Sequence, residues 1–175
     1  MRSPTPAADL ALLLFDVDGI FTDNGLSVDE DGRMSKRFDI RDGAAVKLAQ
    51  MAGYQVGLIS GHDSRAVEKR AEQLGIAICH VGVKDKAPVF EAVLRETGCR
   101  AEEALYMGDD LFDLPVLTRA GFAATVPEAP DFVRRRCHWT ASRPGGRGAV
   151  RELVEHLLRE TGRLDEIQTR FLPGP

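Results

Sequence analysis

The sequence is poor in cysteine, has no excess of basic residues and lacks long apolar runs. Its three cysteines are odd in number and have no CxxC spacing, which excludes a disulfide framework and a cysteine-rich zinc site. Its 27 acidic residues outnumber its 23 basic ones, whereas proteins that bind nucleic acid are usually basic. No run approaches the ~20 apolar residues that cross a bilayer, and the one at 10–15 is too short for a signal peptide. We therefore expect a cytoplasmic protein that binds neither membranes nor nucleic acid.

The remaining composition is typical of one globular domain. Hydrophobic residues make up 43% of the 175 residues and charged residues 29%. A chain of this length buries roughly 70% of its unfolded surface, so it needs no covalent staple. Proline and glycine mark both ends, and residues 1–8 and the tail 162–175 are expected to be mobile unless a partner holds them. Residues 9–161 are expected to form the single domain.

Short apolar runs alternate with longer amphipathic segments along the chain. The strand-length runs are residues 11–15, 55–59, 76–81, 104–107 and 122–125. Helical patterns cover residues 42–52, 63–74, 85–97, 110–119, 130–136 and 147–159. The short runs are apolar throughout, as strands buried on both faces are. The alternation predicts an α/β fold with a doubly wound parallel sheet.

One segment interrupts this alternation directly after the first strand. Between about residues 20 and 38, apolar positions flank the turn signal Asp29-Glu30-Asp31-Gly32, which predicts a β-hairpin that leaves the sheet. Only 43 residues separate Asp16 from Ser60. The hairpin and one helix use most of them, so the sequence predicts a hairpin flap and no cap domain.

Polar side chains follow the predicted strands where each strand ends. They are Asp16 and Asp18 after the first strand, Ser60 after the second, Lys86 after the third, and Asp109, Asp110 and Asp113 after the fourth. Taken singly, each is more often a turn former, a helix cap or a surface charge. Ligands of doubly wound sheets bind beyond the carboxyl ends of the strands, so the ordered set predicts an active site at that edge.

This set of side chains suits phosphoryl transfer. Clustered carboxylates repel one another unless a divalent cation neutralises them, and a few hard oxygen ligands favour Mg²⁺. A carboxylate such as Asp16 can attack phosphorus, while Asp18 can protonate the leaving oxygen and later take a proton from water. Lys86, Ser60 and the backbone N–H groups after Asp16 can stabilise the charge on the transferred group.

The same residues resemble a known superfamily. Asp16-Val17-Asp18-Gly19, Ser60-Gly61, Lys86 and the segment 108–113 are similar to the motifs of the haloacid dehalogenase (HAD) superfamily of phosphatases. The segments 38–43 and 145–152 are typical of a small group without cap domains. From about residue 12 to 166 the chain most resembles the 3-deoxy-D-manno-octulosonate (KDO) 8-phosphate phosphatases, which are homotetramers that act in lipopolysaccharide synthesis.

The resemblance implies a role for each matching residue. Asp16 is the implied nucleophile and Mg²⁺ ligand, Asp18 the acid/base and a ligand through its carbonyl, and Asp109 the third ligand. Asp110 or Asp113 is expected to contact the metal ligands without binding the metal itself. Ser60 and Lys86 are expected to hold the phosphate. The residues implied to contact the sugar-acid substrate are Asp18, Asp39, Ile40, Arg41, Asp42, Gly43, Lys47, Gly61, His62, Arg70 and Lys86.

Two departures from the family pattern leave alternatives open. His62 stands where arginine is common, which removes a bidentate fork, and Asp39 stands where asparagine is common. A phosphatase for a nine-carbon, sialic-acid-like 9-phosphate is therefore the runner-up. A phospho-accepting signalling module is a less favoured class, because its phosphorylated aspartate normally follows the third strand. A catalytically silent relative has no support, because every core residue is present.

Oligomerisation is expected to supply the lid that a cap domain gives other relatives. Apolar residues of the hairpin are expected to pack against copies of the chain. These residues are Ile20, Phe21, Leu26, Val28 and Met34. The tail, with Leu164, Phe171 and Leu172, is a candidate to reach a neighbouring site.

Overall fold

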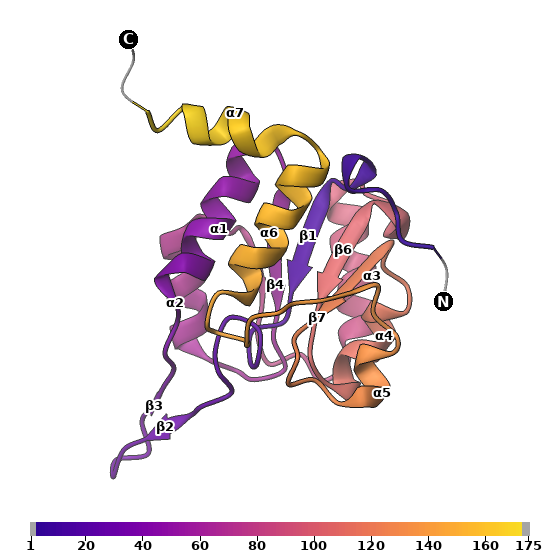
Figure 1. The fold of residues 1–175 in the computed structure, drawn as a ribbon. Helices are drawn as coiled ribbons and strands as arrows, with labels where there is room; N and C mark the ends of the chain where they lie inside the picture. Colours follow the sequence, from indigo (N-terminus) through magenta and orange to yellow (C-terminus); the bar gives the residue numbers. More distant parts are fainter. Residues whose placement is uncertain (1–2, 173–175) are drawn as a thin grey trace.

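A six-stranded parallel sheet forms the centre of the computed structural model, which describes residues 3–172 (Figure 1). Its strands are β1 (Leu12–Phe15), β4 (Gln55–Ile59), β5 (Ile78–His80), β6 (Ala104–Met107), β7 (Phe122–Thr125) and β8 (Trp139–Thr140). They lie in the order β5-β4-β1-β6-β7-β8, with β1 paired to β4 and β6. The five predicted strands are present and β8 extends the sheet. The predicted doubly wound parallel architecture is confirmed.

Helices cover both faces of this sheet, as its connections require. The α-helices are α1 (Ile40–Met51), α2 (Arg65–Leu74), α3 (Lys86–Thr97), α4 (Leu114–Leu117), α5 (Asp131–Arg134), α6 (Ala149–Glu160) and α7 (Arg163–Thr169). Single 3₁₀ turns occur at Ala7–Asp9, Ala101–Glu103 and Leu111–Asp113. The chain moves from β1 to β4 in one direction and from β5 to β6 in the other. Right-handed crossovers therefore place α1 and α3 on opposite faces.

The hairpin β2 (Ser27–Val28) and β3 (Met34–Ser35) projects from the body of the molecule (Figure 1). Leu26, Val28 and Met34 are 46%, 59% and 53% exposed. The expectation for Ile20 and Phe21 was wrong, because both are buried in the protein's own core. They lie in a turn whose N–H groups donate to the Val17 carbonyl, which folds them inward before the hairpin begins.

The C-terminal segment also differs from its expectation. Gly162 adopts a left-handed conformation and is followed by α7, which packs against α6. Leu164 and Ile167 are buried, so this part of the tail belongs to the fold, whereas Phe171 and Leu172 are exposed. Helix α7 is not predictable from the sequence, because its seven residues carry too short an apolar pattern. Residues 1, 2 and 173–175 of the expected mobile ends lie outside the described residues.

The segment before α6 is fastened to the first strand's loop and to α1. The Asp42 carboxylate, buried in α1, accepts hydrogen bonds from the N–H groups of Gly148 and Arg151, each at 3.0 Å. A Cβ at Gly145 would lie 1.7 Å from the Gly19 carbonyl oxygen, so only glycine permits this approach. The loop after β1 is thereby positioned by residues about 125 positions further along the chain.

The described helices include none that is both long enough and apolar enough to span a bilayer. Between β1 and β4 the described chain contains only the hairpin and α1, which confirms the predicted absence of a cap domain. The carboxyl ends of β1 and β6 are therefore left without a covering domain from their own chain.

The buried Asp42 carboxylate gives a test of this packing. Asp42→Ala leaves two N–H groups at the start of α6 without their acceptor, and we expect it to lower the free energy of unfolding by about 1–2 kcal/mol. Chemical denaturation measures the change, with Glu96→Ala on the exposed face of α3 as the control. A loss at Asp42 no larger than that at Glu96 would contradict the assigned contact.

Candidate active site

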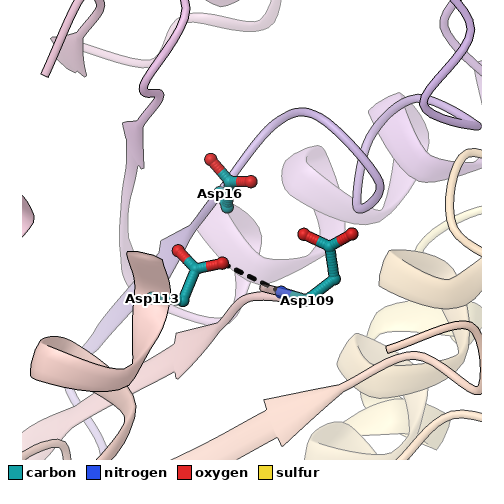
Figure 2. A group of neighbouring side chains, drawn as sticks. All are labelled: Asp16, Asp109 and Asp113. Atoms are coloured by element: carbon teal, nitrogen blue, oxygen red, sulfur yellow. Dashed lines mark hydrogen bonds between the residues drawn. The ribbon is translucent and has the colours of Figure 1, made fainter. Parts of the chain in front are cut away.

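Three buried carboxylates meet at the carboxyl edge of the central strands (Figure 2). Asp16 follows β1, Asp109 follows β6, and Asp113 ends the short 3₁₀ turn after it. Each offers an oxygen atom, and these atoms all lie within 4.8 Å of one another. Neighbouring strands that end together have thus brought side chains almost a hundred residues apart into one cluster, as the sequence predicted.

Asp113 uses both of its oxygens to organise its neighbours. Oδ1 accepts from Lys86 Nζ at 2.6 Å and from the Tyr106 hydroxyl at 2.7 Å. Oδ2 accepts from the backbone N–H groups of Asp109 and Asp110, each at 3.0 Å. These four bonds occupy the carboxylate, so Asp113 is suited to position Lys86 and the backbone at Asp109 rather than to bind a ligand. Asp16 and Asp109 keep oxygens that can bind a cation.

Lys86 supplies a buried positive charge between two of the carboxylates. Its Nζ donates to Asp16 Oδ1 at 2.7 Å, to Asp113, and to the Tyr106 hydroxyl at 3.3 Å. Burial alone lowers the pKa of Lys86, but Asp16 and Asp113 together outweigh burial and raise it. The ammonium therefore stays charged and offsets part of the negative charge of Asp16 and Asp113.

Even so, one ammonium does not neutralise this site. Burial raises the pKa of Asp16 to about 7, with a further contribution from Asp113 that Lys86 opposes. Burial also raises the pKa of Asp109 to about 7, again helped by Asp113. Protonated carboxyl groups are poor nucleophiles and poor ligands. A bound divalent cation would favour the ionised form of both groups.

A cavity of about 490 Å³ opens over this cluster. Its lining holds the carboxyl groups of Asp16, Asp18, Asp109, Asp110 and Asp113 and the amines of Lys84 and Lys86. Such an excess of negative charge repels an anionic ligand unless a cation is bound with it. A larger hollow of about 880 Å³ lies beside Gly121, at the amino end of β7, and is therefore at the opposite edge of the sheet from these carboxylates.

The backbone after β1 is shaped to approach Asp109. Gly19 has a φ of +80°, and a Cβ there would lie 2.0 Å from Asp109 Oδ2. Asn24, itself at φ +62°, donates from Nδ2 to the same oxygen at 3.2 Å. The loop thus orients one ligand-competent carboxylate, and any larger residue at Gly19 would displace it.

The other residues expected to act in the reaction are placed differently. Asp18 lines the cavity, and its carboxylate is paired with the ammonium of Lys36 from the hairpin. Gly61 and His62 also line the cavity. Ser60 is fully buried, and its hydroxyl donates to the His62 carbonyl at 3.4 Å. Its expected contact with phosphate therefore stays a prediction.

The residues expected to contact the sugar acid do not line this cavity, apart from Asp18, Gly61, His62 and Lys86. Asp39 begins α1 and pairs with Arg41 at 2.7 Å, which holds the pKa of Asp39 below its usual range. Ile40 is 81% exposed beside them.

The remaining three side chains have structural partners. The Asp42 carboxylate holds α6, as described above. Lys47 Nζ donates to the Leu74 carbonyl at 2.5 Å, and Arg70 lies over the Phe38 ring, 5.9 Å from its centroid. A Cβ at Gly43 would strike the Arg70 guanidinium, so Gly43 makes room for that side chain. Within one chain, these residues lie outside the cavity over the carboxylate cluster.

Three residues of the site were not among those predicted from the sequence. Asn24, Lys36 and Tyr106 contact Asp109, Asp18 and Asp113, respectively. Tyr106 is in an apolar strand, so its hydroxyl is not visible as a site residue in the pattern. Asn24 and Lys36 lie in the hairpin segment, where an asparagine and a lysine are ordinary. The one signal in the sequence was Asn24 itself, because asparagine tolerates a left-handed turn and this one follows Asp16 and Asp18 closely.

Comparisons with known proteins agree with this geometry. A family model described as haloacid dehalogenase-like hydrolase matches residues 35–121. The 3-deoxy-D-manno-octulosonate 8-phosphate phosphatase KdsC of Salmonella typhi is 35% identical over 162 residues, which cover 93% of this chain and 86% of the relative. Its Haemophilus influenzae counterpart is 33% identical over 161 residues, covering 92% and 89%.

A solved structure extends the match to three dimensions. The phosphatase of the same name from Moraxella catarrhalis, in complex with magnesium ion, phosphate ion and KDO, superposes with a TM-score of 0.93 at 30% identity. The match covers 95% of this chain and 96% of that one. The fold and the carboxylate cluster define a haloacid dehalogenase-like hydrolase. Within that class, the chain belongs to the KDO 8-phosphate phosphatase family.

The raised pKa values predict how stability depends on pH before a cation binds. Asp16 and Asp109 have folded-state pKa values of about 7 against 3.8, so the folded chain holds more protons than the unfolded chain between these values. The free energy of unfolding in EDTA should therefore decrease, by ~1 kcal/mol or more, as pH rises from about 4 to 7.

Denaturation curves of the wild type and Asp109→Asn, recorded side by side, isolate this contribution from other titrating groups. We expect the decrease to be smaller in the variant. We also expect Mg²⁺ added at pH 7 to stabilise the wild type and to release protons into a weakly buffered solution. Parallel pH profiles for the two proteins would refute the assignment.

Proposed function

We propose that this chain is a Mg²⁺-dependent phosphatase that hydrolyses KDO 8-phosphate to KDO and inorganic phosphate. The observation that carries this proposal is the cavity over Asp16, Asp109 and Lys86, in which carboxylates outnumber amines. Such a site suits a phosphate group only when a cation accompanies it. The relatives' shared name and the magnesium, phosphate and KDO of the Moraxella catarrhalis complex support the substrate and the metal.

The residues present fit Mg²⁺. Asp16 and Asp109 have carboxylate oxygens close together, and burial of both groups disfavours their ionisation without a cation. The Asp18 carbonyl is the third proposed protein ligand. When bound, Mg²⁺ would neutralise charge on the carboxylates and on the phosphate oxygens. Asp113 is already occupied by four hydrogen bonds and would hold Lys86 and the Asp109 backbone in place.

In the first step, an Asp16 oxygen attacks phosphorus in line with the sugar oxygen. The bond between phosphorus and the sugar oxygen breaks, and its electron pair stays on that oxygen. Asp18, in its acid form, gives the sugar oxygen a proton, so that KDO leaves as an alcohol. Lys86 stabilises the negative charge on the transferred group, which is now an aspartyl-phosphate on Asp16.

In the second step, water attacks the same phosphorus. Asp18, left as a carboxylate, takes a proton from that water as the bond between phosphorus and the Asp16 oxygen breaks. Asp16 regains its carboxylate, and inorganic phosphate leaves. One side chain therefore acts as acid and then as base, and the site returns to its starting protonation state.

The choice of sugar depends on residues outside the reaction centre. His62 lines the cavity and is shorter than the arginine common in the family, while Asp39 is already paired with Arg41. Because of these two differences, the 9-phosphate of a nine-carbon, sialic-acid-like sugar acid is the second candidate substrate. For either substrate, we place the enzyme in the cytoplasm, and for KDO in the synthesis of lipopolysaccharide precursors.

We further propose that the working form is a homotetramer joined through the hairpins. The hairpin is a two-stranded unit whose apolar side chains Leu26, Val28 and Met34 are exposed, and such hairpins are marginally stable alone. We propose that a second copy that covers them also brings residues 39–41 to a neighbouring cavity. This arrangement would explain why one chain separates its sugar-binding residues from its carboxylates. The exposed Phe171 and Leu172 are candidates for the same interface.

Phosphate release from the two esters tests substrate and nucleophile together. We expect rapid release from KDO 8-phosphate with Mg²⁺, a rate at least ~10-fold lower from a nine-carbon sugar-acid 9-phosphate, and loss of both activities with EDTA. Asp16→Asn should reduce kcat by about 10⁴-fold or more, because an amide oxygen is a far weaker nucleophile. A preference for the nine-carbon ester would instead show that His62 and Asp39 have changed the specificity.

Light scattering with a charged hairpin variant tests the assembly. Met34→Asp places a charge on the proposed interface and should convert tetramers into smaller species with a higher KM for the sugar ester. Phe132→Asp, at a 52% exposed residue on α5, is the matched control and should leave the assembly intact. A wild-type monomer with full activity would overturn the proposed lid.

A further inference from the structure

The hairpin carries a buried lysine that reaches the reaction centre. Lys36 directly follows β3, and its side chain is only 3% exposed although its neighbours along the hairpin are exposed. Its Nζ forms an ion pair with Asp18 Oδ1. The Asp18 side chain itself is 33% exposed toward the cavity. An ammonium from the flap is therefore in direct contact with the side chain that exchanges protons.

The next residue makes a similar link to the same loop, but outside the cavity. Arg37 donates to Asp23 at 2.5 Å, and this pair is exposed, with Arg147 as a second partner of Asp23 at 3.4 Å. Lys36 and Arg37 thus fasten the hairpin to the loop after β1 at two successive positions. Only the Lys36 contact involves a residue of the proposed reaction. Arg37 is therefore a control for the effect of fastening the hairpin alone.

We propose that Lys36 is a positioning residue that holds Asp18 ready for proton transfer to the leaving oxygen. Its contact occupies Oδ1 and fixes the side-chain rotamer, which leaves Oδ2 to carry the transferred proton. The proton moves from Asp18 to the leaving oxygen as the phosphorus–oxygen bond breaks, and Lys36 itself gains and loses nothing.

This inference rests on the proposed function, because an alkyl phosphate is the kind of ester whose leaving oxygen needs that proton. p-Nitrophenyl phosphate does not, since its phenolate leaves readily without one. A defect in Asp18 positioning should therefore slow the alkyl ester and spare the aryl ester. A defect in the fold, in the metal site or in phosphate binding should slow both esters alike.

The experiment compares Lys36→Met with Arg37→Met on KDO 8-phosphate and on p-nitrophenyl phosphate, each with Mg²⁺. For Lys36→Met we expect kcat to fall about tenfold or more with the alkyl ester and less than about threefold with the aryl ester. For Arg37→Met we expect the two esters to change by the same factor. Equal losses on both esters for Lys36→Met, or no loss on either, would overturn the proposal.

Two further arms separate this proposal from the proposed function. If the wild type prefers another alkyl phosphate, the KDO assignment fails, and the ratio measured with that ester still tests Lys36. Thermal unfolding tests the contact without any activity. Lys36→Met should lower Tm in the wild type but not in the Asp18→Ala background, where the ammonium has no acceptor at residue 18. Additive shifts in Tm would show that the two side chains do not act together and would contradict the proposal.

Discussion

The ammonium of Lys86 lies between the carboxylates of Asp16 and Asp113, at 2.7 and 2.6 Å, and the rest of the site depends on this contact. Like charges a few ångströms apart in a buried setting repel strongly. Lys86 removes part of that cost and Tyr106 shares Asp113 with it. What remains uncompensated is at Asp16 and Asp109, where a cation is needed. The negative charge that Lys86 leaves uncompensated is therefore the same charge that a bound cation would neutralise.

The residues proposed for the reaction and most of those proposed for sugar recognition lie in two different parts of the molecule. The carboxyl ends of the strands carry the groups that we propose break and form bonds, and these are held by backbone contacts and by the glycine of the loop after β1, Gly19. The beginning of α1 and the surface of α2 carry the residues expected to recognise the sugar. The hairpin connects the two parts, because Lys36 reaches the reaction centre while Asp39 begins the next helix.

The sequence predicted those features that repeat along the chain or end a strand. Apolar runs gave the five main strands, and the aspartates after them gave the cluster. Features set by tertiary packing were not predictable: Ile20 and Phe21 look like flap residues until the turn at Val17 folds them inward. Ser60 follows a strand as expected, but the direction of its hydroxyl is set by the His62 carbonyl. Lys36 carried no signal, because the length and path of the hairpin decide where it reaches.

The central place of β1 has a consequence for how the protein opens. Both edges of β1 are paired, and its four residues are all buried, so its amides can exchange with solvent only when the whole sheet separates. Asp16 is the next residue, and its N–H also donates to the Met107 carbonyl. The proposed nucleophile is thus attached to the strand that we expect to open last. The hairpin has two short exposed strands, so its tip can open locally while that core stays paired.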